Sequence, residues 1–153
     1  MSKPIVHSKH PFFEEGVQCA ALPFRLGKKG RPEVMLITSR ETRRWVIPKG
    51  WPMKGKTDAE AAKQEAYEEA GIKGNIGSKK IGKYHYVKLR GDKAPVLCEV
   101  SVYPLKVKDE MKRWPEKDER NRKWFSFSDA ADLVDEDGLK KLLIEWEAEL
   151  EHA

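Results

Sequence analysis

The stretch Gly50-Trp-Pro-Met-Lys-Gly-Lys-Thr-Asp-Ala-Glu-Ala-Ala-Lys-Gln-Glu-Ala-Tyr-Glu-Glu-Ala-Gly-Ile72 decides the fold. It predicts a loop, one helix over residues 58–70, and a stop. Thr57 is a suitable N-cap, and Glu60 three positions later completes a capping box. Gly71 supplies the left-handed residue that commonly ends a helix. Alanine recurs on one face of the helix, so we expect this face to lie close against a sheet.

Three carboxylates share another face of the predicted helix. Glu65, Glu68 and Glu69 are spaced i, i+3 and i+4, which brings their side chains together. Hard divalent cations such as Mg²⁺ bind oxygen ligands of this kind. The alternative is a solvated acidic face paired with Lys63 and Lys73, and the helix alone leaves both interpretations open.

The whole stretch resembles the signature of the Nudix hydrolases, G-x5-E-x7-R-E-U-x-E-E-x-G-U, in which U is aliphatic. The matching positions are Gly50, Glu65, Glu68, Glu69, Gly71 and Ile72. Lys56 and Gln64 depart from the signature, because they replace its first Glu and its Arg. The joint loss of both charges is consistent with the loss of one structural ion pair, and the alternative is a damaged site. Because all three helix carboxylates are present, we favour an active enzyme.

The remainder of the chain predicts strands on both sides of the central helix and a second long helix at the end. The expected strands span residues 17–24, 33–39, 45–47, 81–89, 95–107 and 123–127, and the later helices span 128–134 and 138–150. Pro23 suggests that the first strand lies at an edge or contains a bulge. Residues 108–122 are strongly charged and are expected to form an exposed loop.

This order of elements favours an α/β fold with a mixed β-sheet between helices. The resemblance implies the same arrangement, the Nudix-type α/β/α sandwich. We expect residues 1–16 to be a flexible N-terminal arm and residues 17–150 to be a single domain.

The chain is basic, with a net charge of +5 over 153 residues. This charge favours polyanionic partners such as nucleotides, polyphosphates, inositol phosphates or RNA. No apolar run approaches membrane-spanning length, so no membrane partner is expected. Cys19 and Cys98 show no metal-binding spacing, which predicts reduced thiols in a cytoplasmic protein.

Over residues 17–130 the chain resembles the branch of the family that hydrolyses diphosphoinositol polyphosphates and diadenosine polyphosphates. The resemblance implies that substrate is bound by the loop glycine and five further residues, namely Gly50, Thr38, Ser39, Arg40, Arg120 and Arg122. Gly16, Val17 and Gln18 replace a basic cluster of that branch. Their neutrality favours a dinucleoside polyphosphate over a heavily phosphorylated inositol.

The resemblance also implies a mechanism. Mg²⁺, with Mn²⁺ as a substitute, is held by Glu65, Glu69 and the main-chain carbonyl of Lys49. Glu68 is the candidate general base, or alternatively a further metal ligand. The Lys49 ammonium either contacts a phosphate or faces solvent.

The resulting prediction is a Nudix pyrophosphohydrolase that cleaves a phosphoanhydride bond in a nucleoside diphosphate-linked compound or a diphosphoinositol polyphosphate. Removal of pyrophosphate from RNA 5′ ends would use the same chemistry and is an alternative. A second alternative is an inactive Nudix-like module that only binds nucleotide. A basic nucleic-acid-binding protein ranks last, because the basic residues are spread along the chain.

Overall fold

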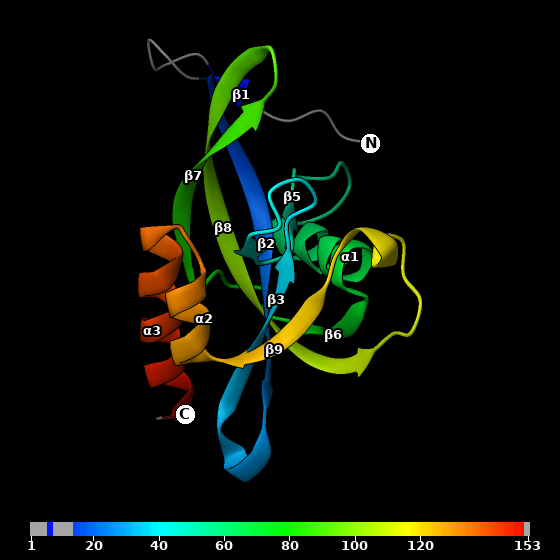
Figure 1. The fold of residues 1–153 in the computed structure, drawn as a ribbon, viewed down its shortest axis with the longest axis vertical. Coiled ribbons are helices and arrows are strands. Elements are labelled where there is room, and N and C mark those ends of the chain that lie inside the picture. Colours follow the sequence, from blue (N-terminus) through cyan, green and yellow to red (C-terminus); the bar gives the residue numbers. More distant parts are fainter. Residues whose placement is uncertain (1–5, 8–13, 152–153) are drawn as a thin grey trace.

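A mixed β-sheet runs through the middle of the protein (Figure 1). The computed structural model describes residues 6–7 and 14–151. Within them the strands are β1 Val6–His7, β2 Glu14–Leu26, β3 Pro32–Thr38, β4 Trp45–Val46, β5 Lys49–Gly50, β6 Ile72–Ile76, β7 Gly82–Arg90, β8 Lys93–Glu110 and β9 Arg122–Ser126. The α-helices are α1 Asp58–Ala70, α2 Phe127–Leu133 and α3 Asp137–Glu151, and short 3-10 turns occupy Lys28–Gly30 and Lys117–Glu119.

The two longest strands lie next to each other and define the centre of the sheet. β2 and β8 pair in parallel from Glu14↔Val96 to Phe24↔Lys106. The main strand order is β4-β3-β2-β8-β6, and the other strand pairs are antiparallel. β5 pairs with β2 at Cys19↔Gly50, which fixes the loop glycine beside the middle of the sheet.

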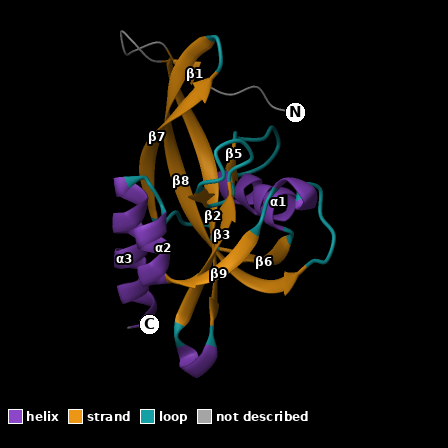
Figure 2. Ribbon diagram, viewed as in Figure 1, coloured by secondary structure: helices purple, strands orange, loops and turns teal. Residues whose placement is uncertain are grey.

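Helices cover both faces of the sheet (Figure 2). Neighbouring residues of a strand point to opposite faces. Cys19 and Ala21 of β2 therefore pack in the core on the α1 side. Ala20 and Leu22 pack in the second core, with α2 and α3. This arrangement confirms the predicted α/β/α sandwich with a mixed sheet.

Helix α1 has the predicted bounds and the predicted ends. The Thr57 hydroxyl accepts from the Glu60 amide at 3.1 Å, and the Glu60 carboxylate accepts from the Thr57 amide at 2.8 Å. Gly71 ends the helix with φ +65°. The recurring alanines Ala59, Ala62, Ala66 and Ala70 are all buried. Small side chains on this face let α1 approach the sheet closely enough to present its carboxylates to β5.

The edge position predicted for the first strand is wrong. β2 begins at Glu14 rather than at residue 17, and it lies inside the sheet with Pro23 paired to Leu105 of β8. Proline has no N–H to donate, which normally excludes it from central strands. Here the β2–β3 ladder begins only at Phe24, so the missing donor of Pro23 falls where no β3 partner is required. Residues 1–5 and 8–13 of the predicted N-terminal arm lie outside the described residues.

Two further differences concern the chain around α1. The five-residue strand β6 was not predicted, although it pairs with β8 directly after the helix. The predicted exposed loop over residues 108–122 is partly wrong, since β8 continues to Glu110 and the residues that follow pack against α1. Near the end, Ser126 caps α2 two residues earlier than the predicted start of this helix, and its hydroxyl accepts from the Asp129 amide at 3.0 Å. Among the described residues, no helix has both the length and the apolar character needed to cross a membrane.

Candidate active site

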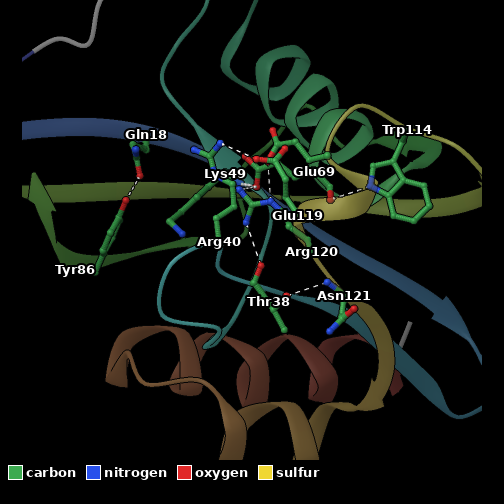
Figure 3. Close-up of polar contacts among 11 residues, drawn as sticks. Gln18, Thr38, Arg40, Lys49, Glu69, Tyr86, Trp114, Glu119, Arg120 and Asn121 are labelled. Atoms are coloured by element: carbon green, nitrogen blue, oxygen red, sulfur yellow. Dashed lines mark hydrogen bonds and ion pairs between the residues drawn. The ribbon is translucent and has the colours of Figure 1, made fainter.

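Four segments that are distant in sequence meet beside the C-terminal half of α1. They are the end of β3, the short strand β5, the last turns of α1 and the segment 111–121 (Figure 3). β5 is held there by its pairing with β2, and the segment 111–121 is held by hydrogen bonds to α1. The Glu69 carboxylate lies in the space where these segments meet, beside Arg120 and the Lys49 main chain (Figure 3).

Glu65 and Glu69 form a directly hydrogen-bonded pair. Glu69 is only 7% exposed. Gly50 makes room for the pair, since a Cβ at this position would lie 2.6 Å from Glu65 Oε1. Burial raises the pKa of Glu65 from 4.5 to about 9, and the nearby carboxylates of Glu69, Glu68 and Glu116 add to the effect. The pair therefore shares one proton at neutral pH when no metal is bound.

Cationic and amide donors surround Glu69. Its Oε1 accepts from the Lys49 amide at 3.3 Å and lies 3.8 Å from Arg120 Nη2. Burial raises the pKa of Glu69, whereas the hydrogen bond from Glu65 and the charges of Arg120 and Lys49 act in the opposite direction. Burial lowers the pKa of Lys49, whose ammonium lies 4.9 Å from the centre of the Tyr86 ring. Glu69 is thus the member of the pair that is best stabilised as an anion.

The paired carboxylates fit a divalent cation. They offer hard oxygen ligands, and they already bind one positive charge in the form of the shared proton. A divalent cation placed between them would remove the repulsion that raises the pKa of Glu65. Within the described residues, however, no group of three acidic, His or Cys side chains stands in a ready-made metal arrangement. Further ligands would therefore come from the main chain, from Glu68, from water or from substrate.

We expect the metal-free protein to lose unfolding free energy as the pH rises from 4.5 towards 9. The unfolded chain releases the Glu65 proton near 4.5, whereas the folded protein keeps it until about 9. The folded state therefore binds more protons in this window, and its stability falls with rising pH. The contribution of Glu65 is fully present below 4.5 and is lost above about 9.

Melting temperatures measured with EDTA and with Mg²⁺, at about pH 6 and about pH 8.5, test this prediction. Mg²⁺ takes the place of the proton, so it should raise the melting temperature more at the higher pH. The Glu65→Gln variant has no carboxyl to titrate and is the control for all other ionisable groups. An equal effect of Mg²⁺ at both pH values would contradict the shared proton.

The predicted phosphate-binding residues 38–40 lie at the end of β3 and just beyond it, where they contact their own loop and residues 119–121. The Thr38 hydroxyl accepts from the Asn121 amide at 2.9 Å, and its side chain is buried. Ser39 Oγ lies 2.6 Å from Thr42 Oγ1 and accepts from the Arg44 amide. Arg40 is exposed and lies 3.6 Å from Glu119. Their role in binding substrate stays a prediction.

The two predicted arginines near the start of β9 have different surroundings. Arg120 precedes this strand and Arg122 is its first residue. Arg120 belongs to the site: it donates to Glu116 at 2.8 Å and to the Thr38 carbonyl at 3.2 Å, and its side chain is 10% exposed. Arg122 instead donates to the main-chain carbonyls of Ala70, Gly71 and Met111. These bonds hold its guanidinium at the end of α1, and the substrate-binding role of Arg122 stays a prediction.

Two residues at the site were missed by sequence reasoning. Glu116 brings a fourth carboxylate near the pair, where it contributes to raising the pKa of Glu65. Trp114 donates its indole N–H to the Glu69 carbonyl at 3.2 Å (Figure 3). The i, i+4 spacing of Glu116 and Arg120 was the available signal for the first. Nothing in the local sequence indicated the second.

Comparisons with known proteins agree with this fold. A family model described as "NUDIX domain" matches residues 18–146. Nudix hydrolase 16, mitochondrial, from Arabidopsis thaliana is 34% identical over 147 residues, which cover 87% of this chain and 81% of that protein. Human diphosphoinositol polyphosphate phosphohydrolase 3-beta is 32% identical over 120 residues, 76% of this chain and 68% of that protein. A Caenorhabditis elegans Ap4A hydrolase structure has the same fold, with a TM-score of 0.67, 23% identity, and coverage of 90% of this chain and 98% of that one.

The comparisons overturn one expectation from the sequence. We expected a cytoplasmic protein, but the Arabidopsis relative just described and four others are mitochondrial by name. Cys19 and Cys98 are buried and unbridged, and this property does not distinguish the two compartments. The cytoplasmic location is therefore wrong as an inference from cysteine usage.

Proposed function

This chain belongs to the Nudix family of hydrolases, and on that basis we propose that it cleaves a phosphoanhydride bond of a dinucleoside polyphosphate in a magnesium-dependent reaction. A diphosphoinositol polyphosphate is the second candidate substrate. The observation that carries the proposal is the contact between Glu65 and Glu69 beside Arg120 and Lys49. This arrangement combines a site for a divalent cation with positive charges for a phosphate chain.

The chemistry needs a cation, a base and phosphate ligands. A divalent cation would be held by Glu65, Glu69 and the Lys49 carbonyl. When bound, it would neutralise charge on the phosphate and lower the pKa of a coordinated water. Glu68, on the same face of α1 and half-buried, accepts the proton of the attacking water. The water oxygen bonds to phosphorus while the bridging P–O bond breaks, and the electron pair leaves with the departing phosphate.

Arg120 and Lys49 are the proposed phosphate ligands. Arg120 is held in place by its bonds to Glu116 and to the Thr38 carbonyl. The Lys49 amide donates to Glu69, and the Lys49 ammonium lies 4.9 Å from the centre of the Tyr86 ring. These two cations offset the negative charge that the substrate brings to an already acidic site.

A dinucleoside polyphosphate is favoured over an inositol substrate because of a neutral residue pair on β2 and β7. Gln18 occupies the position where the resembling branch carries basic residues. It is 4% exposed and accepts a hydrogen bond from the Tyr86 hydroxyl at 2.6 Å. This pair is uncharged, so it offers little attraction to a densely phosphorylated ring. The human relative is named as a diphosphoinositol polyphosphate phosphohydrolase. Diphosphoinositol polyphosphates are therefore the second candidate substrate class.

A substrate panel with Mg²⁺ tests the proposal. It compares diadenosine tetra-, penta- and hexaphosphate with diphosphoinositol phosphates and 5′-triphosphorylated RNA, and it measures product release for each. We expect the highest kcat/KM for a diadenosine polyphosphate. A clear preference for the inositol or RNA substrates would reassign the substrate, and binding without turnover of any of them would indicate an inactive nucleotide-binding module.

A further inference from the structure

The C-terminal end of α1 is capped by a segment that is distant in sequence. The last carbonyl groups of a helix have no partner within the helix. The Glu68 carbonyl accepts from the Glu116 amide at 3.0 Å, and the Glu69 carbonyl accepts from Trp114 Nε1 at 3.2 Å. The Ala70 carbonyl accepts from Arg122 at 2.9 Å. The carbonyls of the candidate base Glu68 and the candidate metal ligand Glu69 are thus fixed by groups from outside the helix.

Trp114 and Arg122 form one unit, which we call the helix-end clamp. The Arg122 guanidinium lies 4.1 Å from the centre of the Trp114 ring. It also donates to the Gly71 carbonyl at 3.1 Å and to the Met111 carbonyl at 2.8 Å. The ring covers Gly71 so closely that a Cβ there would lie 2.7 Å from Trp114 Cγ. The clamp therefore contacts the helix at several adjacent peptide groups.

The segment that carries Trp114 also carries site residues. Glu116 and Arg120 follow within six positions, and Arg120 contacts both Glu116 and Glu69 (Figure 3). A shift of this segment relative to α1 would change the distance between Glu69 and Arg120 directly. The clamp is therefore placed to set the relative position of two groups that act together.

We propose that Trp114 and Arg122 are positioning residues, which hold the turn bearing Glu68 and Glu69 in register with the segment bearing Arg120. The inference rests on the proposed function, because it assigns these residues a task in that reaction. Neither residue needs to touch substrate. They act indirectly, because they fix the main chain of the helix turn that carries Glu68 and Glu69.

The Trp114→Phe variant is the sharpest test, because it removes the indole N–H and keeps an aromatic ring over Gly71. Trp124→Phe is the matched control. Trp124 also stacks on an arginine, with Arg25 4.1 Å from its ring centre, but its buried Nε1 has no hydrogen-bond partner among the described residues. The two substitutions differ mainly in the bond to the Glu69 carbonyl.

We expect Trp114→Phe to lower kcat about tenfold, since a displacement of about 1 Å in an active site can cost about 100-fold. KM should change less than about twofold, because the phosphate ligands remain. The Mg²⁺ concentration that gives half of the maximal rise in melting temperature, measured without substrate, should increase several-fold. Trp124→Phe should leave kcat, KM and the Mg²⁺ response unchanged.

A loss of melting temperature in Trp114→Phe without a change in kcat or Mg²⁺ response would overturn the proposal, because the clamp would then be only structural. Equal effects of the two substitutions would overturn it as well. Arg122→Lys is the second variant, since one ammonium cannot reach three carbonyls, and it should reproduce the kcat and Mg²⁺ effects. If the wild type turns over no substrate, the proposed function fails, while the substrate-free Mg²⁺ titration still decides whether the clamp positions the carboxylates.

Discussion

The Glu68→Gln variant is expected to keep its fold and to lose at least about 100-fold in kcat, the usual size of a general-base contribution. The amide has the shape of the carboxyl but cannot accept a proton from water. The main-chain bond from the Glu116 amide to the carbonyl of residue 68 does not involve the changed atoms. Steady-state rates with Mg²⁺ and the preferred substrate, together with a thermal melt, measure both parts of the prediction.

The Glu60→Gln variant is the control for this change. Glu60 lies on the same helix, and the substitution removes the same charge. Glutamine is accepted at this position of a capping box, so the Thr57 bonds can persist. Near-normal turnover of Glu68→Gln would refute the general-base assignment. A variant that also loses its response to Mg²⁺ would instead identify Glu68 as a metal ligand.

The Gly71→Ala variant is expected to lose about 3 kcal/mol of unfolding free energy. Gly71 has φ +65°, a left-handed conformation that costs an L-residue about 1–2 kcal/mol. The added Cβ would also press on the rigid Trp114 ring, so the ring or the helix end must move. Urea unfolding measures the loss, which is a large share of the stability of a typical domain, about 5–15 kcal/mol.

The Gly91→Ala variant separates the two causes. Gly91 lies in the β7–β8 turn with φ +62°, and a Cβ there would meet nothing within 4 Å. The Gly91→Ala variant should therefore lose only the unfolding free energy that corresponds to the backbone strain, about 1–2 kcal/mol. The excess loss in Gly71→Ala then reports the contact with Trp114. Equal losses of unfolding free energy in the two variants would show that the Trp114 ring moves away from the added Cβ without measurable destabilisation.

Helix α1 and its carboxylates could be predicted from the sequence because their signals are local. The Thr57–Glu60 capping box, the alanine face and Gly71 all lie within one short stretch, and each has its expected geometry. The helical repeat alone brings Glu65 and Glu69 together. The close approach of Gly50 to Glu65 was not predicted, because it depends on the pairing of β5 with β2.

Features that depend on distant partners were missed. β6 contains Gly74 and Asn75, which disfavour strands, and it forms because β8 offers it a free edge. Gly74 is required there, since a Cβ would collide with the Lys106 carbonyl. The segment 108–122 appeared exposed because it is charged, yet Trp114 and Arg122 turn inward to the helix end. Composition describes the average environment of such a segment and misses two residues with specific partners.

The parallel pairing of β2 with β8 has a consequence for how the protein folds. Each pair of partners is about eighty residues apart in the chain, so closing this central ladder costs loop entropy before any pairing compensates for it. During synthesis the middle of the sheet cannot form until β8 has left the ribosome. The helix end beside Glu68 and Glu69 acquires its caps later still, from residues 111–122. Catalytic competence is therefore expected to appear at the close of folding, and refolding followed by activity should lag behind refolding followed by helix content.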